Sequence, residues 1–120
     1  MAFATMLVCI SSCDKTKPST NKLTGTWDVI SIDGETLTAD EKIVFDFRSD
    51  ETFDFTAADS SAIGGGSAAG TWYWYNDKTG LKLSWTEDGS TFVLDFENIS
   101  LTKEDFLCDV NFSNDWVLKK

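Results

Sequence analysis

The chain has 120 residues, of which 42% are hydrophobic and 13% aromatic, so it can bury enough apolar surface to fold as one domain. Its 20 acidic residues outnumber 10 basic ones, and a net charge of −10 excludes the clustered cations that nucleic-acid phosphates require. The sequence has no histidine, which excludes histidine-activated nucleophiles and histidine-ligated zinc or haem.

The N-terminal segment differs from the rest of the chain. Residues 1–12 are uncharged and mostly apolar, and small residues precede Cys13, which a polar and charged stretch follows. Ile10-Ser11-Ser12-Cys13 resembles the lipobox of bacterial lipoproteins. The resemblance implies that residues 1–12 are a signal peptide, truncated because no basic residue precedes Lys15, and that Cys13 is lipidated. Residues 13–22 would then be a lipidated tether; the alternative is an ordinary N-terminal strand or buried helix.

From Leu23 onward, apolar and polar residues alternate along short segments that turn residues separate, which is typical of antiparallel strands. We expect about eight strands and no amphipathic helix, with strands over 24–32, 42–48, from Phe53, and over 71–75, 81–85, 92–96, 106–112 and 115–120. The glycine-rich segment 57–69 is expected to be either a flexible lid or a long surface loop. Residues 23–120 therefore predict an all-β, antiparallel up-and-down barrel, because closure removes exposed edges; a two-sheet sandwich is the alternative.

The first expected strand carries Gly25-Thr26-Trp27, which resembles the Gly-x-Trp signature of lipocalins and of bacterial lipocalin-like lipoproteins. The resemblance implies that Trp27 lies across the closed end of the barrel under a basic side chain from the last strand. We assign that position to Lys119, with Lys120 as the alternative, and predict that Gly25, Trp27 and this lysine close the barrel. A second triplet, Gly70-Thr71-Trp72, marks either a half-barrel repeat or a coincidence.

Acidic side chains are the plentiful titratable groups, but their pattern favours solvent exposure. Asp95 and Glu97 alternate with apolar residues, so nothing predicts the converging carboxylate pair of a glycosidase. The loop residues Asn76, Asp77 and Asp88 lack the spacing of a calcium loop. Cys108 alternates with inward apolar residues and is expected to be a buried, inert thiol. We therefore expect no enzymatic activity, and no catalytic residue, metal or cofactor.

Six aromatic residues on the central strands are candidates for a ligand site: Phe53, Phe55, Trp72, Trp74, Trp85 and Phe92. Their rings either fill the interior or line a cavity for a small hydrophobic ligand. Because two of them precede the glycine-rich segment and Trp72 and Trp74 follow it, we expect these four near one rim.

The leading hypothesis is a monomeric, non-enzymatic lipoprotein of the bacterial cell envelope that binds a small hydrophobic ligand. Its lipid would anchor it to the membrane, on a periplasmic or surface face of the outer membrane. The alternative is a filled barrel that acts as a protein- or glycan-interaction module, such as an inhibitor or accessory subunit.

Overall fold

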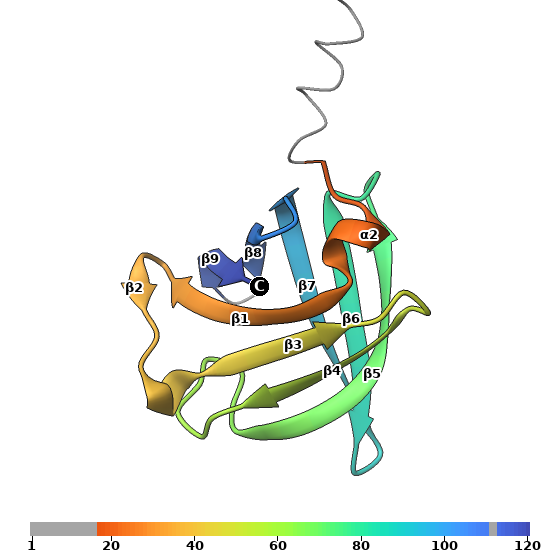
Figure 1. The fold of residues 1–120 in the computed structure, drawn as a ribbon. Coiled ribbons are helices and arrows are strands. Elements are labelled where there is room, and N and C mark those ends of the chain that lie inside the picture. The colour runs from red at the N-terminus through yellow and green to blue at the C-terminus, as the bar shows by residue number, and fades with distance from the viewer. Residues whose placement is uncertain (1–16, 111–112) are drawn as a thin grey trace, which may run out of the picture.

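The computed structural model describes residues 17–110 and 113–120, which form a closed antiparallel β-barrel (Figure 1). Strands β1 and β3 to β9 pair in sequence order, and β9 returns to pair with β1. Strand β2 pairs only with the end of β1 and is extra to the barrel. The predicted up-and-down barrel is confirmed, and the sandwich alternative is wrong.

The described elements are α2 (Thr20–Leu23), β1 (Gly25–Ile32), β2 (Glu35–Thr36), the 3-10 turn η2 (Ala39–Glu41), β3 (Ile43–Phe47), β4 (Thr52–Ala57), β5 (Gly66–Tyr75), β6 (Gly80–Glu87), β7 (Ser90–Leu101), β8 (Asp105–Val110) and β9 (Ser113–Lys119). The expected features of residues 1–16, including the signal peptide and Cys13, lie outside the described residues, as does Phe112.

Two Asp-Gly pairs make two-residue turns between paired strands. Asp33 and Gly34 join β1 to β2, and Asp88 and Gly89 join β6 to β7. All four residues have positive φ angles, between 50° and 83°. A type I′ hairpin turn requires this conformation at both central positions, which is why Asp-Gly favours it.

Alternation of inward and outward side chains fills the barrel. In β3, Ile43, Phe45 and Phe47 are buried while the residues between them are partly exposed. The register places Phe45 opposite Phe55 and Phe47 opposite Phe53 of β4, so their rings share the inward face. Because side chains alternate between the two faces of a strand, a barrel of eight strands encloses one aromatic core.

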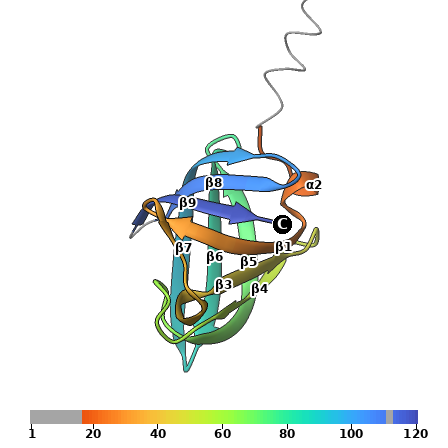
Figure 2. The ribbon, with the colours of Figure 1, turned by 60° about the vertical axis from the view of Figure 1, so that its left-hand side comes forward.

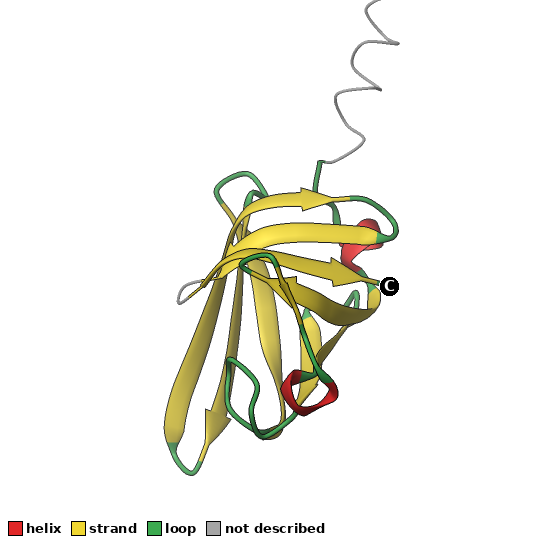
Figure 3. Ribbon diagram, turned by 90° about the vertical axis from the view of Figure 1, so that its left-hand side faces the viewer, coloured by secondary structure: helices red, strands yellow, loops and turns green. Residues whose placement is uncertain are grey.

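The barrel has two ends that differ in their connections. The closed end comprises α2 and the turns 48–51, 76–79 and 102–104, and the C-terminus lies close to it (Figure 2). The open end comprises the segments 33–42, 58–65 and 87–90, which connect the opposite ends of the strands (Figure 3). Backbone hydrogen bonds from Ala58 to Lys42 and from Ser60 to Asp40 join two of these segments.

Two expectations of local structure are corrected. Strand β5 begins at Gly66, so residues 66–69 of the expected loop are strand. They form a strand because they pair with residues 54–57 of β4. The expected tether does not extend to Lys22, because residues 20–23 form one helical turn whose Leu23 is fully buried. The Ser19 side chain caps this turn by accepting a hydrogen bond from the Lys22 backbone N–H.

Candidate functional site

Trp27 is the centre of the closed end. Its side chain is 0% exposed, and its indole N–H donates to the Leu23 carbonyl at 2.8 Å. The Phe106 ring meets it edge-on, with the ring centroids 5.6 Å apart. The Lys120 ammonium lies 4.9 Å from the Trp27 ring centroid and donates to the Lys22 carbonyl. One indole therefore ties the first strand, α2 and the C-terminus together.

The basic side chain over Trp27 belongs to Lys120, and the assignment to Lys119 is wrong. Side chains of neighbouring strand residues point to opposite faces, so Lys119 points outward, where it forms an ion pair with Asp105. Gly25 has a φ of 131°, and a Cβ built there would lie 2.8 Å from the Lys120 Cε. The glycine therefore provides both the positive φ and the room for this lysine.

Trp72 and Trp74 also lie at the closed end. The Trp72 indole donates to the carbonyls of Arg48 and Thr52, which lie at the two ends of the turn that joins β3 to β4. The Trp74 indole donates to the Thr20 hydroxyl of α2. The expectation that the four rings gather at the rim beside the glycine-rich segment is therefore wrong. The reason is that β5 runs the full length of the barrel from Gly66 and carries both indoles to the far end. Phe53 also lies nearer the closed end, because it pairs with Gly70 while its neighbour Thr52 pairs with Thr71.

The other four candidate rings form one connected group that extends toward the open end. Phe53 and Phe55 stack on each other, and Trp85 contacts both edge-on, with centroid distances of 6.2 Å and 5.0 Å. Phe92 stacks on Trp85 at 5.7 Å and is 44% exposed. The rings that were expected to line a cavity thus pack on one another, except for the outer face of Phe92.

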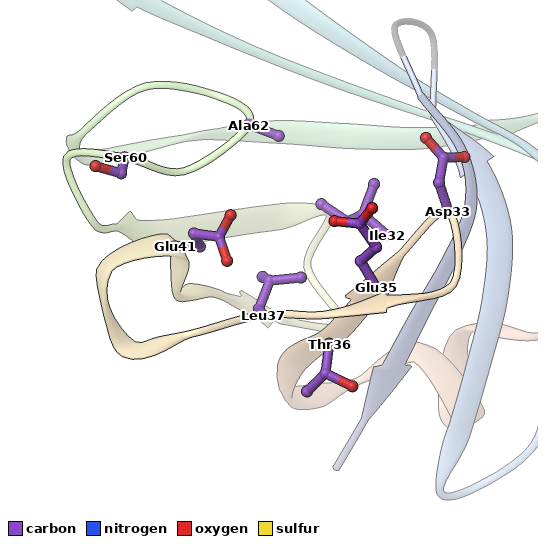
Figure 4. Close-up of a pocket in the computed structure, with 8 residues that line it drawn as sticks. All are labelled: Ile32, Asp33, Glu35, Thr36, Leu37, Glu41, Ser60 and Ala62. Carbon is purple, nitrogen blue, oxygen red and sulfur yellow. The ribbon is translucent and has the colours of Figure 1, made fainter.

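A pocket of about 270 Å³ lies at the open end, between the segments 33–42 and 58–65 (Figure 4). Ile32 and Leu37 supply its apolar lining, and Asp33, Glu35 and Glu41 supply carboxylates. Glu41 is fixed there because its carboxylate accepts hydrogen bonds from the Thr38 backbone N–H and hydroxyl. Sequence reasoning missed this pocket, since segments without periodicity carry no signal of how they pack together.

Negative charge gathers at the open end. Its three segments contain seven acidic side chains and the single base Lys42; the acids are Asp33, Glu35, Asp40, Glu41, Asp59, Glu87 and Asp88. The closed end is different, because Arg48 in the turn 48–51 pairs with Asp46 and Asp54 at 3.1 Å and 2.9 Å. A partner with positive charge is therefore attracted to the open end rather than to the surface around Arg48.

The described residues offer little reactive chemistry. Cys108 is buried as predicted, and its burial raises the pKa of the thiol well above the usual value, which suppresses the nucleophilic thiolate. In the described part of the chain, no group of three or more histidine, cysteine or acidic side chains is placed to hold a metal ion. Over the same residues, no helix is long and apolar enough to cross a membrane.

Comparison with known proteins finds a similar fold but no matching family. Neither a scan against protein-family models nor a search of curated proteins finds a match. Among solved structures, the chain is similar to an NMR structure of a protein from Bacteroides uniformis ATCC 8492, with a TM-score of 0.62 and 19% sequence identity. The match covers 90% of this chain and 96% of that one and concerns the fold alone.

Proposed function

We propose that this protein is a non-enzymatic, lipocalin-like lipoprotein of the bacterial cell envelope whose open end binds a protein partner. The observation that carries the proposal is the contrast between the filled interior and the open end. At the open end, the half-exposed ring of Phe92, an acidic rim and a pocket occur together. This is the interaction module that the sequence left as the alternative.

The packing of the interior favours a partner outside the barrel over a ligand inside it. Ring contacts continue from Trp27 through Phe106 and Phe47 to Phe53, and from there through Trp85 to Phe92. Centroid separations of 5.6 to 6.5 Å along this path are those of rings in direct contact. A ligand inside the barrel would have to displace these rings.

The position of the N-terminus supports an open end that faces away from the membrane. The described chain enters the barrel at the closed end through α2 (Figure 1). An acylated Cys13 would precede Lys17 by four residues, a span of at most about 14 Å at the extended length per residue. Such an anchor would hold the closed end against the lipid and leave the acidic end accessible.

Site-specific photocrosslinking in the producing cells tests the location of the partner. A photoreactive amino acid is introduced at Asp59 or Asp88 of the open end, and at Asp77 or Lys103 of the closed end as matched controls. All four side chains are exposed. We expect adducts at Asp59 and Asp88 only; adducts confined to the closed end, or none at all, would overturn the proposal.

The lipid anchor has its own test. Cells that express the full-length gene are labelled with radioactive palmitate, and we expect label in the wild-type protein and in Cys108→Ser but none in Cys13→Ser. Three acyl chains at about 0.8 kcal/mol per buried methylene make such an anchor practically irreversible. Equal labelling of Cys13→Ser would remove the anchor from the proposal.

The second candidate function is the binding of a small apolar ligand at the mouth of the barrel, that is, at the pocket and the exposed face of Phe92 at the open end. The apolar lining of the pocket by Ile32 and Leu37 and the exposed face of Phe92 favour it. Titration with an environment-sensitive apolar dye tests it, because we expect a dye bound against Phe92 to quench the fluorescence of its neighbour Trp85. We expect Leu37→Asn to weaken dye binding; unchanged binding in this variant and in Phe92→Ala would exclude the mouth as the site.

A further inference from the structure

The wall of the barrel opens between β5 and β6 near the open end. Pairing between these strands runs from Tyr75 opposite Gly80 to Gly70 opposite Trp85 and stops there. Strand β5 nevertheless begins at Gly66 and β6 continues to Glu87. Residues 66–69 pair with β4 on one side only, so within the described chain their other edge has no strand partner. Antiparallel geometry directs the N–H and C=O groups of alternate residues, two of the four, into the opening.

Gly70 marks the last close contact between the two strands before they separate. A Cβ at Gly70 would overlap the Ser84 carbonyl oxygen and lie 2.9 Å from the Trp85 Cβ. The two backbones therefore approach closely at Gly70, and β5 curves away toward β4 while the β6–β7 hairpin continues past the barrel (Figure 1). Glycine permits such an approach because it has no side chain.

An apolar surface adjoins this free edge. Trp85 stands opposite Gly70 at the last paired position, and Phe92 stacks on it with an angle of 21° between the ring planes. Trp85 also contacts Phe55 at 5.0 Å, so the surface is continuous with the core. The 44% of Phe92 that is exposed offers a contact for one apolar side chain of an added strand.

Apart from its short length, the free edge has no protection of its own against strand addition. Soluble proteins guard edges with lysine, proline or a bulge, but residues 66–69 are Gly-Ser-Ala-Ala. The acidic side chains of Asp59, Glu87 and Asp88 lie in the segments that flank the opening. A second copy of this chain would bring its own net charge of −10 to the same place, which disfavours self-association here.

We propose that an extended segment of a protein partner, with alternating apolar and basic side chains, adds as a strand to the 66–69 edge of β5. Its backbone pairs with β5, an apolar side chain covers Phe92, and the cations on its other face lie toward Asp88 and Asp59 of the flanking turns. This inference rests on the proposed function and adds the mode of binding and the chemistry of the partner. Strand addition of this kind draws affinity from main-chain hydrogen bonds and specificity from alternate side chains.

The test uses the full-length protein and three synthetic peptides. The first is a capped octapeptide of alternating lysine and valine with one central phenylalanine. The second is the same peptide with alternate backbone nitrogens methylated, and the third has glutamate in place of lysine. We expect the first to bind, and each of the others to bind about tenfold more weakly or worse. Amide NMR shifts should be concentrated in residues 66–69 and 85–92.

Variants with matched controls locate the site. Phe92→Ala should weaken binding of the first peptide by about tenfold, because a central aromatic contact is lost. Val93→Ala is the control, since Val93 is 43% exposed on the opposite face of the same strand. Asp88→Lys should weaken binding, whereas Glu104→Lys at the closed end should not. Folding of each variant is verified by its denaturation midpoint.

The possible results distinguish a failure of strand addition from a failure of the proposed function. Equal binding of the methylated peptide, or equal effects of Phe92→Ala and Val93→Ala, would overturn strand addition. No binding of the first peptide, combined with crosslinks at Asp59 and Asp88, would overturn it while leaving a partner at the open end. Dimerisation in sedimentation that Phe92→Ala abolishes would overturn it in favour of a second copy.

Discussion

The two ends of this barrel use aromatic residues in opposite ways. At the closed end, Trp27, Trp72 and Trp74 each donate an indole N–H to a neighbouring segment. At the open end, the Trp85 indole donates to Glu87 of its own hairpin, and Phe92 covers Trp85 only on one side. A large ring stabilises most when it joins separate segments and is fully buried. Stability therefore resides mainly at the closed end, and the open end is available for binding.

Replacing Trp27 with alanine should give the largest loss of stability. The fully buried ring, its hydrogen bond to Leu23 and the Phe106 contact are all lost, and we expect about 3–5 kcal/mol less free energy of unfolding. Phe92→Ala is the open-end counterpart and should cost about 1 kcal/mol or less. Urea denaturation measures both. Equal losses in the two variants would contradict the division between the ends.

Gly70→Ala tests the point at which β5 and β6 separate. The added Cβ overlaps the Ser84 carbonyl, so β5 and β6 must move apart, and we expect about 1–3 kcal/mol of destabilisation from overpacking. Gly89→Asn is the control, because Gly89 has open space around it and asparagine tolerates its φ of 81°. A denaturation midpoint of Gly70→Ala equal to that of the wild type would show that the strands do not meet closely there.

Lys120→Met removes the cation over Trp27 while keeping an apolar stem. We expect about 0.5–1 kcal/mol of destabilisation and a shift of the Trp27 indole N–H resonance in two-dimensional NMR. Lys119→Met serves as the control, because it loses only the ion pair with Asp105 at the surface. The assignment of Lys120 as the closing residue fails if Lys119→Met moves the indole resonance and Lys120→Met does not.

Tyr75, beside the closed end, affects stability only at high pH and not at neutral pH. Burial first, and then the charges of Asp95 and Glu97, raise the pKa of Tyr75 to about 12. In unfolded chains tyrosine ionises near about 10, so the folded state holds the proton longer and stability falls as the pH rises from the lower value to the higher. In Tyr73→Phe, where Tyr75 is the sole tyrosine, phenolate absorbance should report this midpoint, and Asp95→Asn should lower it. A midpoint near the unfolded value in the intact protein would contradict this.

The sequence predicted the strands well because alternation reports local geometry. The pattern in β3, β4 and β6 directly gave the buried residues Phe45, Phe53 and Leu83, and it placed Cys108 in the core. Prediction failed for residues 66–69, because alanine, serine and glycine carry no alternation of hydrophobicity and become a strand only when β4 pairs with them. For the same reason nothing in the composition of residues 20–23 indicated a helical turn, which depends on burial of Leu23.

By itself, the sequence determined the fold class, the inward face of the main strands and the strong negative charge, since each follows from residue type and spacing along the chain. Only the tertiary structure decided which end of the barrel each tryptophan occupies, that Lys120 rather than Lys119 covers Trp27, and that the candidate ligand rings fill the interior. It also decided where the wall opens, at Gly70. The physical reason is that these features depend on how strands far apart in the chain are staggered, tilted and bent around the barrel axis, and local alternation carries no record of that geometry.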